Sequence, residues 1–398
     1  MKSGEGPDSS VVAFPHDFQG LAGGDTGSSA MRSDLLATGR FEQRPDPAAG
    51  LCIIPALPCR KAGPRGLGVD WPAFPVDSVP MKPIKNHFFL VVLAGSTVFA
   101  QTNAQKQLQD AFVAEQQGRF DPAIRLTQSV IDSNQLQGVE LGRAWIMLGA
   151  ACEVEGKLTE AQAAFERALR ILERDPQAAG DYASALDNYA GFYNDAGQDQ
   201  IALELWNKTL AMWEKLGDHA ALMRSLTKLA GLSIVQHRMR AARRYLERAS
   251  QEMRLSPDLV ADDLAILSET QAWLALAEGH ASVAVAGFRR ALEIVSRQHG
   301  EQHWLTGWEY MLCGKAYAQS GDLDRALENM RKGLAIIDHA LGANNPKYFV
   351  AQIGYSQLLD QTGSHREAAQ LRGAAEQASK DFYRGQCPGC TINVAGFR

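Results

Sequence analysis

Two short patterns in the sequence combine residue types and spacings that could carry chemistry. Cys387 and Cys390 form a Cys-x-x-Cys pair, which is typical of a redox pair, of half a zinc site or of a small disulfide. His299 and His303 lie four positions apart, so two imidazoles on one helix face could hold a metal ion. The chemistry of either pair depends on the structural element that contains it.

The context of both pairs favours a structural role. The cysteines lie in the C-terminal tail CPGCTINVAGFR, after the last expected helix and without further zinc ligands nearby. A redox enzyme would present them at a helix N-terminus in a βαβ setting. We therefore expect a local disulfide, with redox activity of the tail cysteines as the alternative. The histidines fall in a loop between two repeats, where we expect no metal site.

The rest of the sequence contains no catalytic motif, since it has no Walker loop, nucleophile elbow or metalloprotease motif. We expect no catalysis and no cofactor. The formal charge of −5 argues against a nucleic-acid partner. The content of 45% hydrophobic and 21% charged residues is that of a folded protein. No apolar run approaches the roughly 18–20 residues needed to cross a bilayer.

Residues 1–80 differ in composition from the rest of the chain. They contain 10 of the 16 prolines and 11 of the 36 glycines, and they show neither helical nor strand periodicity. Such a segment cannot bury enough apolar surface to offset its chain entropy. We expect it to be disordered.

Residues 81–100, MKPIKNHFFLVVLAGSTVFA, have the three parts of a secretory signal. Lys82 and Lys85 provide positive charge, an apolar run begins at Phe88, and cleavage is expected after Ala100. Because signal peptides act at an N-terminus, we interpret Met81 as the true start and residues 1–80 as upstream sequence. The mature chain would then be periplasmic or secreted, or cytoplasmic if the segment is not processed.

From about residue 104 the chain repeats itself. One alanine recurs at spacings of 38, 41, 40, 42, 42 and 42 residues, at Ala123, Ala161, Ala202, Ala242, Ala284, Ala326 and Ala368. Turn residues, usually glycine, precede it by about five positions. The copy HRMRAA, residues 237–242, lacks that glycine and is expected to form the weakest turn. The pattern predicts seven stacked helix pairs and an all-α fold.

The copy at 143–169, RAWIMLGAACEVEGKLTEAQAAFERAL, resembles the tetratricopeptide repeat (TPR). Cys152 replaces the usual tyrosine; Cys152 and Cys313 occupy packing positions and are expected to be buried thiols. The longer period and ASALDNYAGFY (183–193) resemble the kinesin light chain type of array. The resemblance covers residues 104–384 and implies a right-handed superhelix with a concave inner face, followed by a tail over 385–398.

In TPR arrays the first helix of each pair lines the concave face, and the resemblance therefore implies which side chains project into the groove. Amides, cations and indoles there would suit an extended peptide or a protein segment. The candidate groove residues are Arg143, Asp187, Asn188, Asn194, Arg224, Lys228, Glu269, Trp273, Trp308 and Lys315.

Part of this set resembles the carboxylate clamp of chaperone-associated TPR domains. Asn188, Arg224 and Lys228 match three clamp residues in type and rough position, whereas Ile146 and Ala150 stand where the first lysine and asparagine should be. Only half of the clamp is present. The leading hypothesis is an exported interaction scaffold without catalysis, and the alternative is an intracellular receptor that senses a peptide.

The interpretation of Met81 can be tested by mass spectrometry of the protein made from its own gene. We expect no peptide from residues 1–80 and a mature N-terminus at Gln101. Peptides from residues 1–80 would contradict it.

Overall fold

The computed structural model describes residues 103–256, 259–387 and 390. The chain divides into two compact units, Met1–Phe74 and Pro75–Arg398, and every described residue belongs to the second. The extension over 1–80 and the signal segment over 81–100 lie outside the described residues, so both stay predictions. All statements below concern the described residues.

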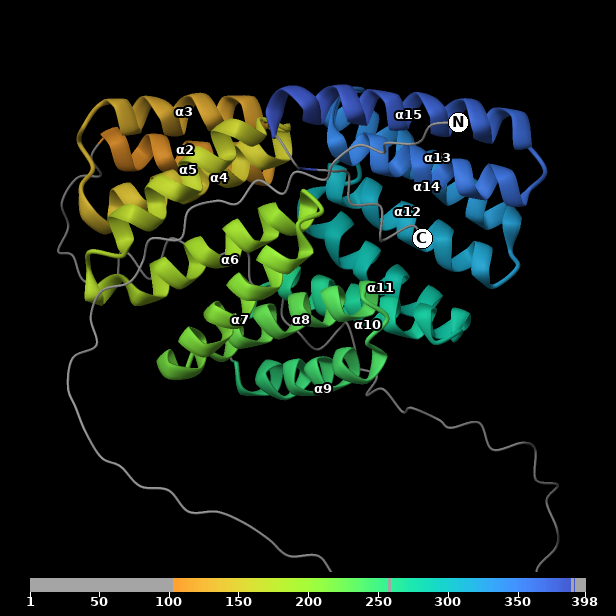
Figure 1. The fold of residues 1–398 in the computed structure, drawn as a ribbon, viewed down its shortest axis with the longest axis horizontal. Helices are drawn as coiled ribbons and strands as arrows, with labels where there is room; N and C mark the ends of the chain where they lie inside the picture. The colour runs from red at the N-terminus through yellow and green to blue at the C-terminus, as the bar shows by residue number, and fades with distance from the viewer. Residues whose placement is uncertain (1–102, 257–258, 388–389, 391–398) are drawn as a thin grey trace, which may run out of the picture. The chain divides into compact units, whose positions relative to one another are not determined.

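The described chain is helical throughout and contains no strand. Its α-helices follow one another with short turns (Figure 1), and a short 3-10 helix, Pro176–Ala178, precedes α6. The helices are α2 (Asn103–Gln116), α3 (Phe120–Asp132), α4 (Gly138–Glu155), α5 (Leu158–Leu172), α6 (Ala179–Asp195), α7 (Asp199–Leu216), α8 (His219–Val235), α9 (Met239–Leu255), α10 (Ala261–Ala277), α11 (Ala281–His299), α12 (Trp304–Gln319), α13 (Leu323–Leu341), α14 (Pro346–Gln361) and α15 (His365–Gln386).

These helices form seven antiparallel pairs, as the repeat predicts. We call the first member of each pair, from α2 to α14, an A helix, and the second, from α3 to α15, a B helix. Each A helix packs mainly on its own B helix, and each B helix also contacts the next A helix. Several consecutive A helices, such as α4 and α6 or α8 and α10, touch directly. The A helices therefore form one continuous layer.

Small residues at the crossings hold each pair together. The recurring alanines are all essentially inaccessible to solvent. In the second pair, a Cβ atom on Gly149 would lie 2.7 Å from the ring of Phe165. In the sixth pair, a Cβ on Gly314 would lie 2.5 Å from Met330. A large side chain of the B helix thus fills the space beside the backbone of the A helix, which gives close packing and little freedom in the crossing angle.

The turns within the pairs follow the sequence pattern. Gly156 ends α4 in the left-handed conformation, with φ of 84°, where a side chain would be strained. In the fourth pair, His237 takes the corresponding position with φ of 56°. A histidine in this conformation is less favourable than glycine, and the expectation that this turn is the weakest stays a prediction.

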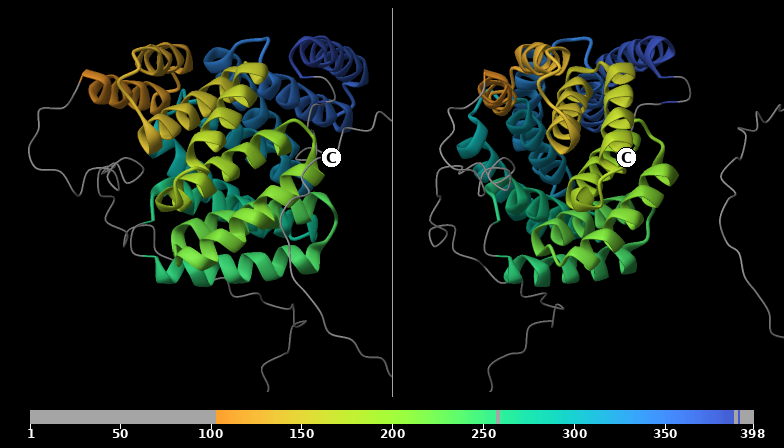
Figure 2. Two further views of the ribbon diagram at one scale, coloured as in Figure 1. Left: turned by 60° about the vertical axis from the view of Figure 1, so that its left-hand side comes forward. Right: turned by 90° about the vertical axis from the view of Figure 1, so that its left-hand side faces the viewer.

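The array closes on itself, because its last helices contact its first ones. The side chain of Asn345 donates a hydrogen bond to the carbonyl oxygen of Val154, with an N–O distance of 2.7 Å. The hydroxyl of Thr159 donates to the carbonyl oxygen of Gln386 at 2.6 Å. Figure 2 shows the helices following one another around a single turn until the blue α14 and α15 reach the yellow α4 and α5.

Apolar side chains also cross this closing contact. Gly156 faces the ring of Phe382 and the Cδ atom of Pro346, each 3.2 Å from the position a Cβ atom would take. Tyr383 and Phe382 join the hydrophobic cluster of the first repeats. The sequence analysis gave no indication of this contact.

Asn345 provides a direct test of the closure. It is 3% exposed, and besides its bond to Val154 it caps α14 by accepting from the backbone N–H of Lys347. We expect Asn345→Ala to lower the free energy of unfolding by about 2–3 kcal/mol, since it removes a cap and the hydrogen bond across the closing contact.

Asp218→Ala is the matched control, because Asp218 caps α8 without contacting the other end of the array. It should cost only about 1 kcal/mol, as measured by urea unfolding. Equal losses in the two variants would show that the contact between the ends contributes nothing.

Candidate functional site

Polar side chains connect neighbouring A helices from α4 to α12, and we call this set the polar row. At its start, the guanidinium of Arg143 on α4 bonds to the carboxylate of Asp181 on α6, with an Nη2–Oδ2 distance of 2.9 Å. Further along, the ammonium of Lys228 on α8 pairs with Asp187 on α6. Each ion pair thus joins one repeat to the next.

The third ion pair joins Arg224 on α8 to Asp263 on α10, at 3.1 Å between Nη1 and Oδ2. The side chain of Asp263 is only 5% exposed, whereas that of Arg224 is 30% exposed. Burial raises the pKa of Asp263 in spite of the neighbouring guanidinium. In this pair the acid is covered, and part of the cation faces outward.

Two glutamates replace the ion pair between α10 and α12. Glu269 and Glu309 share a hydrogen bond, and Glu309 is 4% exposed. Burial raises the pKa of Glu269 to about 7, and burial together with the charge of Glu269 raises the pKa of Glu309 well above its usual range. Burial of the two carboxyls against each other therefore favours their neutral forms.

An indole and an amine lie next to this acid pair. Trp273 donates a hydrogen bond to Glu269, and the ammonium of Lys315 lies 4.8 Å from the centre of the Trp273 ring, within cation–π range. Burial lowers the pKa of Lys315 to about 8. The ring of Trp273 in turn packs edge-on against Phe288.

The polar row continues across the closing contact of the array. Lys347 on α14 bonds to Asp195 at the end of α6, with an N–O distance of 2.8 Å, and its ammonium lies 5.1 Å from the centre of the Trp304 ring. Glu153 on α4 lies nearby, and burial followed by the charge of Asp195 raises its pKa to about 8. The second, third and last repeats therefore meet in one polar cluster.

The structure places all ten predicted groove residues at partly buried positions. It brings together Lys228 with Asp187, and Glu269 with Trp273 and Lys315. The residues of the half clamp do not converge. Arg224 and Lys228 bond to acids on opposite neighbouring helices, and the amide of Asn188 donates to a backbone carbonyl of its own helix at 2.8 Å. Their role in binding stays a prediction.

Sequence reasoning missed six residues that complete the polar row and its cluster at the closing contact. The residues it missed are Asp181, Asp263, Glu309, Glu153, Asp195 and Lys347. A signal for some of them exists, because the paired residues in three ion pairs are 38, 39 and 41 positions apart, close to the repeat period. A search for opposite charges one period apart would have found these pairs.

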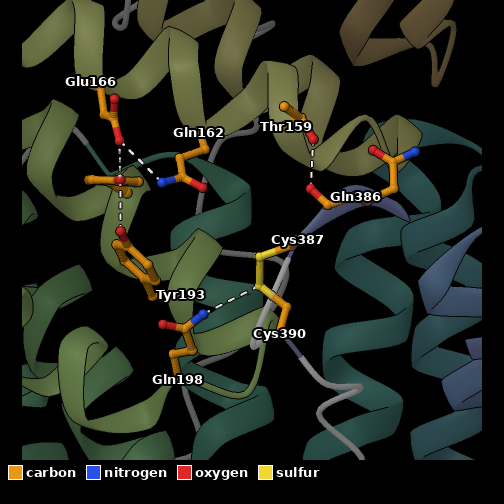
Figure 3. The surroundings of a disulfide bond; sticks show 9 residues. Thr159, Gln162, Glu166, Tyr193, Gln198, Gln386, Cys387 and Cys390 are labelled. Atoms are coloured by element: carbon orange, nitrogen blue, oxygen red, sulfur yellow. Dashed lines mark hydrogen bonds between the residues drawn. A yellow bond between two sulfur atoms is a disulfide. The ribbon is translucent and has the colours of Figure 1, made fainter. Parts of the chain in front are cut away.

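The tail cysteines form a disulfide that lies against the first repeats (Figure 3). Cys387 and Cys390 are each 7% exposed, and the amide of Gln198 donates to the sulfur of Cys390 at 3.3 Å. Because redox-active cysteines are usually accessible to their substrates, this burial favours a structural role. Cys152 and Cys313 are buried free thiols, as expected.

His299 and His303 do not form a metal site with other ligands in the described part of the chain, where no three metal-binding side chains gather. His299 is the last residue of α11 rather than part of the loop, and it bonds to Asp262 at 2.8 Å. His303 caps α12 by accepting from the N–H of Leu305. Burial, followed by the charge of His299, lowers the pKa of His303 to about 4.

Comparison with known proteins identifies the fold. No family model and no curated protein matches the chain. Among solved structures, the Rap conjugation gene regulator of plasmid pLS20 in complex with the Phr* peptide superposes with a TM-score of 0.57 at 12% identity, covering 79% of this chain and 81% of that one. A Rap protein complexed with competence and sporulation factor superposes with a TM-score of 0.52 at 13% identity, covering 71% of this chain and 78% of that one.

A putative kinesin light chain from Podosopora anserina with TPR-like repeats gives a TM-score of 0.37 at 20% identity, covering 50% of this chain and 96% of that one. The chain has the fold of a TPR-type array, a right-handed all-α solenoid. At these identities the likeness concerns the fold alone. Among the described helices, none is long and apolar enough to cross a membrane.

The buried carboxyls predict how stability depends on pH. Because the pKa of Glu269 is about 7 in the folded chain and about 4.3 when unfolded, the folded state binds more protons between these values. Stability is therefore highest below about pH 4.5 for this pair and falls as pH rises through 7.

Glu309→Gln keeps a donor for Glu269 but removes one buried acid. We expect melting temperatures, measured by calorimetry from about pH 5 to pH 8, to fall less steeply in this variant than in the wild type. Glu367→Gln, at an exposed position of α15, serves as the control. Parallel curves for all three proteins would contradict the interpretation that burial raises the pKa values of this acid pair.

Proposed function

We propose that this chain is a scaffold without catalysis that binds an extended segment of another protein along its A helices. The polar row is the observation that carries this proposal. The side chains of Arg143, Arg224 and Lys228 are each about 30% exposed, whereas their acidic partners are more covered.

This difference in exposure leaves donors available to a ligand. A guanidinium has five N–H groups and an ammonium has three, and the ion pairs of Arg224 and Lys228 use only some of them. The remaining donors could bind backbone carbonyls or carboxylates of a peptide without breaking the pairs between repeats. Trp273 and Trp308, both partly buried, would contact its apolar side chains.

The two Rap structures support a peptide ligand, because one holds the Phr* peptide and the other holds competence and sporulation factor. Both share the fold of this chain. From these structures we take only the type of ligand, a peptide. In this chain we expect the residues of the polar row to contact it.

We further propose that the protein is exported, on the strength of the signal pattern at residues 81–100. The second candidate function is an intracellular receptor for a peptide signal, and the two Rap complexes support the type of ligand that it requires. The compartment that holds a tagged chain separates the two candidates.

Peptides selected from a random phage-displayed library against the folded chain provide the probe for a binding test. We expect Arg224→Ala combined with Lys228→Ala to weaken binding of the selected peptides at least tenfold in calorimetry, since two charge-assisted bonds are lost. Arg224→Lys keeps the positive charge beside Asp263 but removes the parallel N–H donors of the guanidinium. It should therefore weaken peptide binding less than the double variant does.

Arg366→Ala combined with Lys380→Ala, at exposed positions of α15, removes the same charge elsewhere and should leave affinity unchanged. Circular dichroism establishes that each variant is folded. Selected peptides that bind the folded Arg224 and Lys228 variant as tightly as the wild type would overturn the proposal.

A further inference from the structure

Helix α9 carries a concentration of positive charge that the proposed binding face does not use. Residues 238–255 contain six arginines and no lysine, against two glutamates, which gives a net charge of +4 in a chain whose total is −5. Arginine is the residue that best binds carboxylates through two parallel hydrogen bonds. The helix is a B helix and belongs to the layer opposite the polar row.

The charge lies on the outward side of the helix. Ala242, Leu246 and Ala249 are fully buried and form the stripe that packs into the core. Arg240 and Arg244 are one turn apart on the opposite side, and both are exposed. The helical spacing continues this outward line through Gln251 to Leu255 at the end of the helix.

Most of this charge has no partner within the described chain. Arg243 pairs with Glu278, and Arg248 pairs with Glu214 at 2.7 Å. Exposed arginines without an ion pair to any described residue remain at the N-cap, Arg238, and along the helix, Arg240, Arg244 and Arg254. Several like charges close together on one helix repel one another. Binding of a partner with the opposite charge would relieve this repulsion.

One apolar side chain lies at the end of the same line. Leu255 is 60% exposed, the most exposed large apolar residue in the described part of the chain. The outward face of α9 therefore offers charged contacts at its arginines, followed by an apolar contact at Leu255.

We propose that the outward face of α9 binds an acidic segment of a second protein, with carboxylates on Arg240 and Arg244 and an apolar residue on Leu255. This surface is separate from the polar row, so the chain would connect two partners. A membrane fits less well, because the apolar stripe of α9 is already used in the core and cannot enter a bilayer. A nucleic acid fits less well, because the net charge of the chain is negative.

The test uses the full chain and a short fluorescein-labelled peptide of glutamate and alanine that ends in leucine. Its twin, with glutamine in place of glutamate, reports binding that does not depend on charge. We expect the acidic peptide to bind in fluorescence anisotropy, the twin to bind at least tenfold more weakly, and added NaCl to weaken the binding.

Arg240→Glu combined with Arg244→Glu should weaken the acidic peptide at least tenfold, and Leu255→Ser should weaken it several-fold. Arg366→Glu combined with Lys380→Glu on α15 changes the net charge equally and should leave binding intact. The proposal is overturned if the acidic peptide does not bind, or if both double variants weaken it equally. It is also overturned if vesicles containing phosphatidylserine or a DNA duplex bind the wild type and the peptide does not.

Discussion

The close crossing of two helices at small residues is the constraint on which the rest of this structure depends. Where Gly149 meets Phe165 and Gly314 meets Met330, there is no room for a Cβ atom. The crossing angle of the two helices in such a pair is therefore nearly fixed. Because the pairs repeat, each one is rotated in a similar way relative to the one before it. The turn of the array and the alignment of its A helices both follow from this repetition.

Alignment of the A helices accounts for the polar row. Equivalent positions in consecutive repeats come side by side, so a cation in one repeat meets an acid about one period later, as Arg224 meets Asp263. Closure of the array extends the row, since Lys347 of the last repeat reaches Asp195 of the third. Packing at the crossings thus positions charged groups that are far apart in sequence, and the proposed binding function depends on that positioning.

Sequence could predict the seven pairs, because each copy carries its own alanine, its own turn and its own apolar spacing. It also identified the turn that lacks glycine, where His237 takes a positive φ, and the buried thiols of Cys152 and Cys313. It did not predict the closure, which is the sum of small rotations that no single repeat encodes. The buried pair of Glu269 and Glu309 was missed for a related reason, since burial of both acids depends on two repeats packing together.

The distance between the two ends of the array tests the central claim most directly. Glu160 on α5 and Arg384 on α15 are exposed and lie close in sequence to Thr159 and Gln386, which bond across the closing contact. Spin labels on cysteines at these two positions can be measured by pulsed electron paramagnetic resonance. A closed turn gives one narrow distribution at short distance, whereas a broad distribution at long distance would contradict the account.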